Sequence, residues 1–389
     1  MAVENWVAKD IEALTEFRRD LHRNPELLYD VHRTAASVAE RLRSYGCDEV
    51  VEGIGRTGVV GVIHGQSNTS GRTIGLRADM DALPIKEETG AEWASTVAGK
   101  MHACGHDGHT TMLLGAAKHL ADSRAFDGCV LVIFQPAEEG GAGARAMIED
   151  GMFTRWPCDE VYGMHNRPNL PVGEFTISEG PIMASVDEVR LRVVGQGGHA
   201  AMPHNTVDPL PIAAALIQAV QGLTARSLDP MDNAVVSLCT IHAGDAFNVI
   251  PQEVEITGTV RTLREEVRTH IEERLRVLVE QTCVAQGAEG HLEYIRMYPV
   301  TVNNPEGTLR AARAAQEVAG DKNVSLDMPA SMGGEDFSFM LNEVPGAIIN
   351  IGNGPSAGLH HPAYDFNDDV IAWGCSYWTT LVRQRMPLA

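Results

Sequence analysis

The chain has 389 residues, more than one ordinary hydrophobic core supports, so two domains are expected. Its content of 44% hydrophobic and 21% charged residues is typical of a soluble globular enzyme. The formal net charge of −21 argues against nucleic acid or an anionic membrane as a partner.

The first part of the chain alternates helices with short apolar strands. The helical pattern over residues 5–42 breaks at Asn24-Pro25, which predicts two helices joined by a turn. The run CVLVIF at 129–134 is apolar throughout, as expected for a parallel strand buried on both faces. This alternation predicts a doubly wound or mixed α/β sheet. Further strands are expected at 59–63, 73–76 and 161–164, and further helices at 111–120 and 142–150.

After about residue 181, the strands alternate apolar and polar residues. DEVRLRVV at 187–194 and EVEITGTVR at 253–261 indicate half-exposed antiparallel strands. Together with helices at 209–223 and 265–286 and strands at 234–241 and 291–297, they give the order β-α-β-β-α-β. That order is the ferredoxin-like split pattern, and the segment has the size of one small domain.

The first pattern resumes at Pro305, with a helix to about 318, a strand at 347–351 and a last helix at 370–385. The smaller domain is therefore inserted within the larger one. The expected fold class is α/β, with a mixed, mainly parallel sheet flanked by helices and an inserted ferredoxin-like α+β domain. The larger domain is predicted to span 1–183 and 300–389, and the insertion 184–299.

The stretch MHACGHDGHT at residues 101–110 holds a dense group of potential metal ligands. His102, Cys104, His106 and His109 are donors suited to zinc, manganese, cobalt or nickel. They lie where strand and loop give way to a helix N-terminus, a usual place for a site in an α/β protein. Ordinary loop or capping residues would also fit this stretch alone, so the rest of the chain decides.

Acidic and imidazole side chains also follow several of the predicted strands. In open α/β sheets, ligands bind outside the carboxyl ends of the strands, so these side chains are expected to converge. Adjacent carboxylates that leave a buried strand point to different sides, so one can bind a metal ion while the other acts as a general base. A metal site at this edge is therefore favoured. The side chains are Asp79 and Asp81, Glu138 and Glu139, His165, and His360 and His361.

The seven cysteines are odd in number and widely scattered, which predicts reduced thiols rather than a disulfide framework. No uncharged apolar run reaches the length of a membrane span, and residues 1–20 lack the apolar core of a signal peptide. These features predict a cytoplasmic protein.

A series of motifs, in order along essentially the whole chain, resembles the zinc-peptidase family of aminoacylases and glutamate carboxypeptidases. The resemblance is closer to its hippurate hydrolase and auxin-conjugate amidohydrolase branch. Several motifs are modest individually, but the ordered set is specific. The motifs are LRADMDALPI (76–85), HACGHDGH (102–109), FQPAEEGG (134–141), GMH (163–165), GGHAAMPH (197–204), FNVIP (247–251), GTVR (258–261), GGEDFS (333–338) and LHHPAYDF (359–366).

The resemblance implies a site for two divalent metal ions, zinc or manganese, with cobalt or nickel as alternatives. It implies that Glu138 is the catalytic base and that Asp81 orients a metal ligand. Relatives carry His-x-Asp where this chain has Asp79-Met80-Asp81, so Asp79 departs from the family pattern. The metal ligands that it implies are Cys104, His106, Glu139, His165 and His361.

The inserted domain resembles the lid and dimerisation domain of the family, which implies a homodimer or a dimer-based tetramer. His199 is implied to reach the active site of the partner subunit and to donate to the oxyanion. Asn248 and Arg261 are implied to hold the free α-carboxylate of the substrate, for which the fork of an arginine is suited.

The implied reaction is hydrolysis of a hippurate-like N-acyl amino acid to a carboxylic acid and a free amino acid. One rival is a cysteine-nucleophile amidase that uses Cys104 with His106 or His109. The other is a non-catalytic metal-binding dimeric protein on the same fold, which the presence of Glu138 disfavours.

Overall fold

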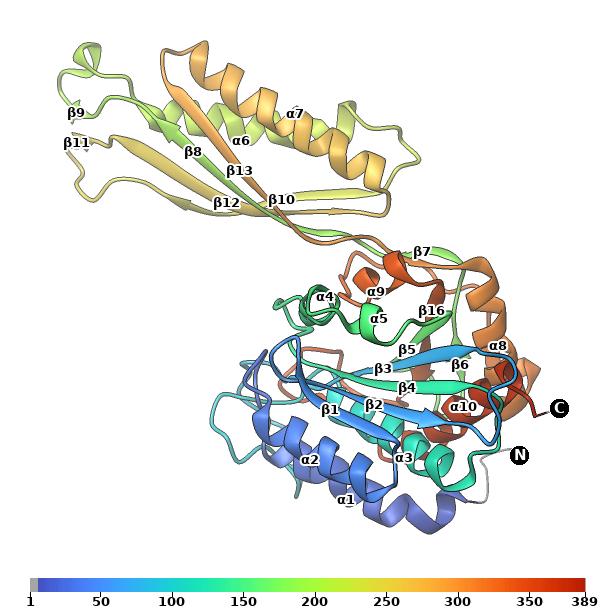
Figure 1. The fold of residues 1–389 in the computed structure, drawn as a ribbon. Helices are drawn as coiled ribbons and strands as arrows, with labels where there is room; N and C mark the ends of the chain where they lie inside the picture. The colour runs from blue at the N-terminus through green and yellow to red at the C-terminus, as the bar shows by residue number, and fades with distance from the viewer. Residues whose placement is uncertain (1–5, 389) are drawn as a thin grey trace. The chain divides into compact units, whose positions relative to one another are not determined.

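The structure, a computed structural model, describes residues 6–388, which form two compact units (Figure 1). Unit 1 comprises residues 6–180, Val302–Pro329 and residues 336–388, and unit 2 comprises Pro181–Thr301 and Ala330–Glu335. The sequence predicted an insertion at 184–299 only. Ala330–Glu335 groups with unit 2 because Ser331 pairs with the first residues of that unit. The Ser331 carbonyl accepts the Ala184 N–H at 3.2 Å, and the Ser331 N–H donates to the Ile182 carbonyl at 3.0 Å.

Unit 1 is built on an eight-stranded mixed sheet. In spatial order its strands are β1 (Glu49–Ile54), β2 (Gly58–His64), β4 (Cys129–Gln135), β3 (Thr73–Asp79), β5 (Glu160–Arg167), β16 (Gly346–Gly352), β6 (Phe175–Thr176) and β15 (Val324–Ser325). The central strands β4, β3, β5 and β16 run parallel, whereas β2 and β6 are antiparallel to these central strands. The predicted mixed, mainly parallel sheet is thus confirmed.

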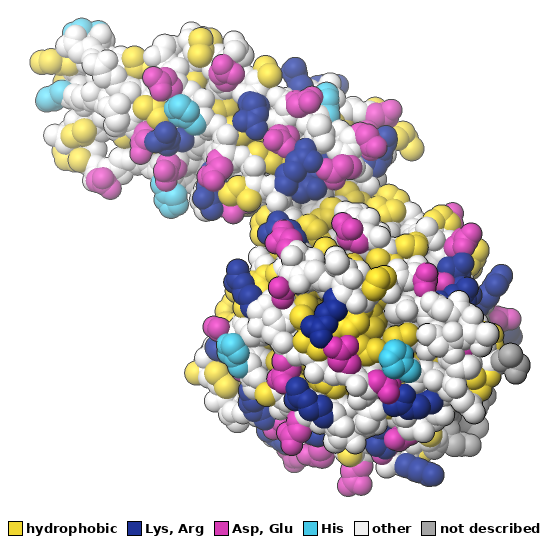
Figure 2. All heavy atoms as spheres, in the orientation of Figure 1, with side chains coloured by type: hydrophobic (Ala, Val, Ile, Leu, Met, Phe, Trp, Pro, Cys, Tyr) yellow, Lys and Arg dark blue, Asp and Glu magenta, His cyan; other side chains and the backbone are white. Residues whose placement is uncertain are grey.

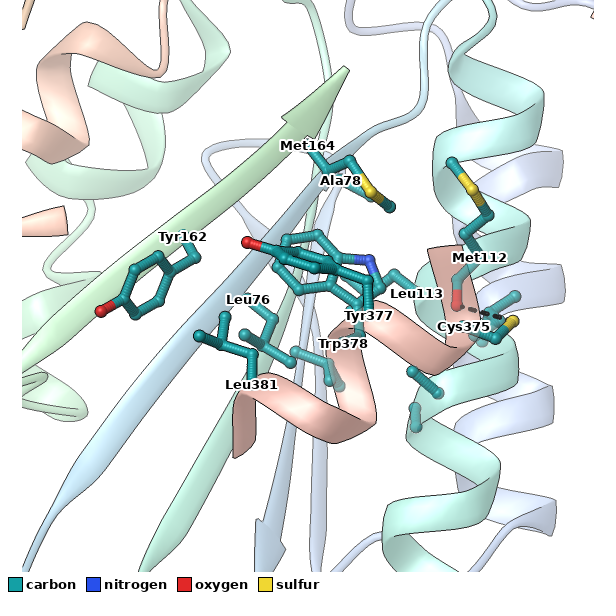
Figure 3. Packing of buried hydrophobic residues seen from close by; sticks show 14 of the residues in the cluster. Leu76, Ala78, Met112, Leu113, Tyr162, Met164, Cys375, Tyr377, Trp378 and Leu381 are labelled. Atoms are coloured by element: carbon teal, nitrogen blue, oxygen red, sulfur yellow. Dashed lines mark hydrogen bonds between the residues drawn. The ribbon is translucent and has the colours of Figure 1, made fainter. Parts of the chain in front are cut away.

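Helices cover both faces of this sheet, which explains why every residue of β4 is buried. Figure 1 shows α1, α2 and α3 on one face and α4, α5 and α9 on the other. Figure 3 shows Trp378 of α10 beside Leu113 of α3, Cys375 of α10 beside Met112 of α3, and Leu381 of α10 near Leu76 of β3. The helices are α1 (Val7–Arg23), α2 (His32–Ser44), α3 (His106–Ser123), α4 (Gly143–Glu149), α5 (Met152–Arg155), α8 (Pro305–Ala319), α9 (Ser338–Glu343) and α10 (Val370–Arg385).

Two differences from the predicted elements affect the site. The helix expected at 111–120 begins at His106, because Gly105 adopts a left-handed backbone (φ +88°) and turns the chain into α3. The strand expected at 73–76 continues to Asp79. The break between α1 and α2 falls where Asn24-Pro25 predicted it, whereas Asn5, where the helical pattern started, lies outside the described residues.

Unit 2 is a four-stranded antiparallel sheet in the order β10-β12-β8-β13, with α6 and α7 on one face (Figure 1). Its core joins strand residues such as Leu191 and Val254 to helix residues such as Leu216 and Leu275. The order β-α-β-β-α-β confirms the ferredoxin-like prediction. The elements are β8 (Val186–Val194), α6 (Pro209–Arg226), β10 (Ala234–His242), β12 (Glu253–Thr262), α7 (Glu265–Val284) and β13 (Glu289–Tyr298).

Short elements complete the two units. In unit 2, β9 (Gly198–His199) pairs with β11 (Val249–Ile250). The others are β7 (Gly180–Met183), β14 (Thr301–Asn303) and the 3-10 helices Pro203–Asn205 and Asp321–Asn323. None of the helices within residues 6–388 is long and apolar enough to cross a membrane. The cysteines are free thiols, in agreement with the predicted absence of a disulfide framework.

Candidate metal centre

The predicted strand-end side chains of unit 1 converge, because the central parallel strands end at the same edge of the sheet. Five groups of potential ligands among residues 6–388 have ligand atoms within 4.8 Å of one another, and three of these groups overlap pairwise at Cys104, His106 and Glu139. The three overlapping groups are Cys104 with His106 and His165, Cys104 with Glu139 and His360, and His106 with Glu138 and Glu139. We call Cys104, His106, Glu139, His165 and His360 the ligand cluster, and Glu138 joins it through the third group.

Cys104 and His106 are presented by the turn that starts α3. Between them, a Cβ atom on Gly105 would lie 2.4 Å from Asn166 Oδ1, so only glycine fits. Cys104 Sγ lies 3.4 Å from His165 Nε2. His106 Nδ1 donates to the Asp81 carbonyl at 2.7 Å, which leaves Nε2 facing the cluster.

Asp81 fixes the two adjacent glutamates as well as His106. Its buried carboxylate accepts the backbone N–H of Glu138 at 2.9 Å and that of Glu139 at 3.1 Å. One residue thus holds an imidazole through its carbonyl and the carboxylate loop through its side chain. This geometry supports the orienting role that the resemblance implied for Asp81.

The loop that carries Glu138 and Glu139 has an unusual backbone. Ala137 and Ala142 have φ of +53° and +54°, a left-handed conformation that costs about 1–2 kcal/mol for a residue with a Cβ atom. The Ala137 N–H donates to the Leu28 carbonyl at 3.2 Å, and the Tyr29 hydroxyl donates to the Gly141 carbonyl at 2.7 Å. Contacts from the α1–α2 turn therefore hold the strained loop in place.

The two carboxylates take different positions as a result. Glu139 Oε1 lies 3.9 Å from His106 Nε2 and 3.4 Å from His360 Nε2. Glu138 Oε1 lies 3.4 Å from the backbone nitrogen of Asp336. Both carboxylates have an oxygen within 4.8 Å of a ring nitrogen of His106, and Glu139 also lies near His360.

The structure brings His360, rather than the predicted His361, to the cluster. His360 has a left-handed backbone (φ +62°), and its N–H donates to the Ala103 carbonyl at 2.8 Å. His361 instead uses Nδ1 to accept the Ala363 N–H at 3.0 Å, and it belongs to none of the ligand groups found among residues 6–388. The structure therefore favours His360 over the predicted His361 as a candidate ligand.

Electrostatics of the cluster favour a cation. Burial raises the pKa of the Cys104 thiol well above its usual value, and it lowers the pKa of His165 to about 3. Burial also lowers the pKa of His106, but Asp79 and the other nearby carboxylates outweigh it and raise that pKa to about 10. The same negative field that holds a proton on His106 would stabilise a metal ion.

Two buried atoms of the cluster provide a direct test of whether a metal fits. Neither His106 Nε2 nor Glu139 Oε1 makes a hydrogen bond within the described residues. A buried polar atom that makes no hydrogen bond costs about 1–3 kcal/mol, which a coordinated cation would offset. A thiolate, imidazoles and a carboxylate are also a donor set that suits zinc and its first-row neighbours. The residues present fit a metal ion.

Comparison with known proteins identifies the family. Residues 75–384 match Peptidase family M20/M25/M40. The chain belongs to this family. A hippurate hydrolase of Campylobacter jejuni is 42% identical over 380 residues, which cover 97% of this chain and 98% of that protein. An N-acetylcysteine deacetylase of Bacillus subtilis is 38% identical over 95% of both chains.

A solved structure extends the likeness to three dimensions. A dinuclear metal-binding peptidase of the M20 family from Bacillus subtilis superposes with a TM-score of 0.85 at 34% identity, covering 97% of this chain and 99% of that one. The predicted family and fold are confirmed, and membership makes the chain a hydrolase of amide bonds.

The remaining predicted residues of this M20 peptidase belong to unit 2. His199 on β9 faces Val249 of β11, and Asn248 accepts the Ala200 N–H through its carbonyl at 3.1 Å. Exposed His199 and Asn248 are therefore neighbours. Arg261 lies on β12, where its Nε donates to Thr259 Oγ1 at 3.1 Å.

Sequence reasoning missed two buried charges that support the site. Arg77 on β3 is 1% exposed, with Nη1 2.7 Å from Asp79 Oδ2 and Nη2 3.1 Å from Asp336 Oδ1. Asp336 also accepts the Ala144 N–H at 2.9 Å. An arginine within an otherwise apolar strand was the available signal, because a buried cation needs carboxylate partners.

Proposed function

We propose that this chain is a metal-dependent amidohydrolase that cleaves N-acyl amino acids to a carboxylic acid and a free amino acid. The observation that carries the proposal is a buried carboxylate, Glu138, beside a cluster of metal-ligating side chains. The names of the hippurate hydrolase and N-acetylcysteine deacetylase relatives support an N-acyl amino acid as the substrate class.

The proposed metal site holds two divalent cations, zinc or manganese, with cobalt or nickel as alternatives. When bound, the cations would polarise the amide carbonyl and lower the pKa of water to about 7. The dinuclear metal-binding M20 peptidase of similar structure supports a pair of ions. The proposed ligands are Cys104, His106, Glu139, His165 and His360.

Glu138 is the proposed general base. Its carboxylate takes a proton from the attacking water and later donates it to the nitrogen of the leaving amino acid. Asp81 keeps it in place by accepting its backbone N–H at 2.9 Å. The Asp336 N–H donates to Oε1 at 3.4 Å and helps to orient the carboxylate.

Unit 2 is proposed to supply substrate contacts and to form the subunit contact. His199 would donate to the oxyanion, and Asn248 and Arg261 would hold the substrate carboxylate. Phe247 is fully exposed, and Figure 2 shows hydrophobic and histidine side chains at the end of the unit where β9 and β11 lie. Such exposed apolar groups, and the edge position of β10, support a homodimer or a dimer-based tetramer.

Charge and cysteine usage support the remaining proposals. Figure 2 shows basic and acidic side chains interspersed over the viewed face, and the net charge is −21, so a nucleic-acid partner is disfavoured. Free thiols support a reducing compartment, the cytoplasm.

The deciding experiment compares metal-loaded and chelated protein on N-benzoylglycine, N-acetylcysteine and a panel of other N-acyl amino acids. We expect hydrolysis that stops on complete metal removal and returns when zinc or manganese is restored. The matched variant Glu138→Gln keeps the shape of the side chain, so it should retain metal and lose turnover.

Two outcomes would favour the rival functions. Activity that survives metal removal but is lost on thiol alkylation would indicate a cysteine amidase that uses Cys104. A fully metal-loaded protein that hydrolyses none of the panel would favour a binding role, and a Glu138→Gln variant with normal turnover would exclude this residue as the base.

A further inference from the structure

A chain of hydrogen bonds runs through the interior of unit 1 beside the ligand cluster. Its members are 0–2% exposed, so none of its bonds competes with solvent. In order along the chain of bonds, they are Arg77, Asp79, His109, Asn166 and Tyr364. We call this set the buried relay.

His109 occupies the middle of the buried relay and uses both ring nitrogens. Nδ1 donates to Asp79 Oδ1 at 2.7 Å. Nε2 accepts the Asn166 N–H at 3.0 Å, and Asn166 Oδ1 lies 2.8 Å from the same nitrogen. Both ring nitrogens therefore lie within hydrogen-bond distance of a buried partner, Asp79 on one side and Asn166 on the other.

The two ends of the relay anchor it to other parts of the interior. Arg77 Nη1 donates to the second oxygen of Asp79 at 2.7 Å. The side-chain amide of Asn166 donates to the hydroxyl of Tyr364. Both oxygens of Asp79 and both nitrogens of His109 are therefore already occupied by hydrogen bonds.

Three members of the relay, His109, Asn166 and Tyr364, lie in segments that carry a proposed ligand. His109 is in the first turn of α3 with His106, and its ring centroid is 5.5 Å from that of His106. The same ring meets His165 edge-on, with centroids 4.6 Å apart. Asn166 follows His165 directly, and Tyr364 follows His360 within the same loop. The relay thus ties together segments that are far apart in sequence.

His109 was one of the four donors in the cluster at 101–110, and its atoms lie within 4.8 Å of those of Asp79 and His106. This grouping alone would also fit a metal ligand. Because the hydrogen bonds of the relay leave neither nitrogen free, His109 contacts the ligands rather than a metal ion.

We propose that His109 is a positioning residue that sets the separation and orientation of His106 and His165 by bonding Asp79 and Asn166 at the same time. The inference rests on the metal ligands assigned under the proposed function. Loss of a residue that orients ligands typically lowers metal affinity by about 10–100-fold. His109 therefore tunes the affinity and the coordination geometry of the metal pair.

The test titrates the metal-free full chain with Co²⁺ alone and, separately, with Zn²⁺ against a chromophoric chelator. His109→Phe fills the same space but removes both hydrogen bonds, and His109→Gln can keep one of them. Tyr364→Phe removes only the last hydroxyl of the relay. Thr111→Val is the matched control, because Thr111 is buried on the same helix and its hydroxyl bonds the Asp107 carbonyl outside the relay.

We expect His109→Phe to bind two cations about 10–100-fold more weakly than the unchanged chain, with a shifted Co²⁺ visible spectrum. His109→Gln and Tyr364→Phe should show smaller shifts in the same direction. Thr111→Val should keep the affinity within about twofold, with an unchanged spectrum. Thermal unfolding of each metal-free variant shows which ones fold, and if His109→Phe does not, the other two relay variants decide.

Several outcomes would overturn the inference. Relay variants with unchanged affinity and spectrum would exclude a positioning role. Loss of one whole metal equivalent from folded His109→Phe at saturating Co²⁺ would make His109 a ligand. Equal weakening in Thr111→Val would show general damage to the interior. If the unchanged chain binds no divalent cation, the proposed function itself fails, and this result is distinct from the others.

Discussion

Asp81→Asn tests whether the site depends on one carboxylate that holds two backbone groups. In the structure the Asp81 carboxylate accepts the N–H groups of Glu138 and Glu139 at 2.9 and 3.1 Å. An asparagine of the same shape offers one oxygen, and its NH₂ group would face the other N–H. The substitution therefore removes one bond and opposes two donors, without leaving a cavity.

The size of the effect follows from these contacts. A hydrogen bond to a charged group contributes about 1.5–3 kcal/mol, and an unsatisfied buried N–H costs about 1–3 kcal/mol. We expect the free energy of unfolding of metal-free Asp81→Asn to fall by about 2–4 kcal/mol, since the two contributions overlap. Displacement of the loop that carries Glu138 and Glu139 should also weaken metal binding by about 10–100-fold and lower kcat.

Asp127→Asn is the matched control. The Asp127 carboxylate accepts two backbone N–H groups, from Thr69 at 2.6 Å and Ser70 at 2.9 Å. Asp127 lies before the start of β4, whereas Glu138 lies after its end. The length of the strand therefore separates the backbone groups that Asp127 holds from those that Asp81 holds. Asp127→Asn should lower stability but leave metal affinity and kcat unchanged.

Urea unfolding of the metal-free variants, chelator-competition titration with Zn²⁺ and steady-state kinetics measure these quantities separately. The expected result is a loss of stability in both variants and a loss of metal affinity and kcat in Asp81→Asn only. If Asp81→Asn kept the metal affinity and kcat of the unchanged chain while losing stability, Asp81 would be an ordinary turn-holding residue. The orienting role argued from the two N–H contacts would then be refuted.

Three further predictions follow from individual side chains. Metal titration should show a large loss of affinity in His360→Ala and little change in His361→Ala, and the reverse order would restore the assignment read from the sequence. Ala137→Gly should change the free energy of unfolding by less than about 1 kcal/mol or raise it, because relief of about 1–2 kcal/mol of strain exceeds the added entropy of the unfolded chain. Urea unfolding that showed a large loss would mean that this alanine is not strained. Burial lowers the pKa of His22, but Asp107 and Glu87 outweigh burial and raise this pKa to about 9. The protonated imidazole therefore adds to the free energy of unfolding fully below about pH 6.5, and this contribution is lost as the pH rises through 9. Unfolding curves over this range should show the decline in the unchanged chain and not in His22→Gln.

The sequence predicted those parts of the fold that depend on local pattern. Continuous apolar residues at 129–134 predicted a strand buried on both faces, and alternation at 187–194 and 253–261 predicted half-exposed strands. The start of α3 was missed because its first residues are polar, and Gly105 alone sets the turn. The sequence did not predict that residues 330–335 would group with unit 2, because their pairing with residues 182–184 is a long-range contact without local signal.

At the site, the sequence identified donor types better than individual donors. Adjacent histidines in LHHPAYDF have the same chemistry, and only the left-handed backbone of His360 distinguishes them. That conformation depends on the bond from His360 N–H to the Ala103 carbonyl, which comes from a distant loop. The resemblance alone therefore does not decide between the two positions.

Long-range contacts and buried charges stabilise the unusual backbone conformations around the ligand cluster. Left-handed backbone at Ala137, Ala142 and His360 is unfavourable for residues with a Cβ atom, so contacts elsewhere must hold it. The Leu28 and Ala103 carbonyls supply two of those contacts, and the Arg77 guanidinium fixes the carboxylates behind them. Each of these partners lies far away in sequence or inside an apolar strand. The cluster is thus determined by tertiary contacts that act on a few backbone dihedrals, and a substitution at Leu28 or Arg77 that moved those dihedrals would alter metal binding without touching a ligand.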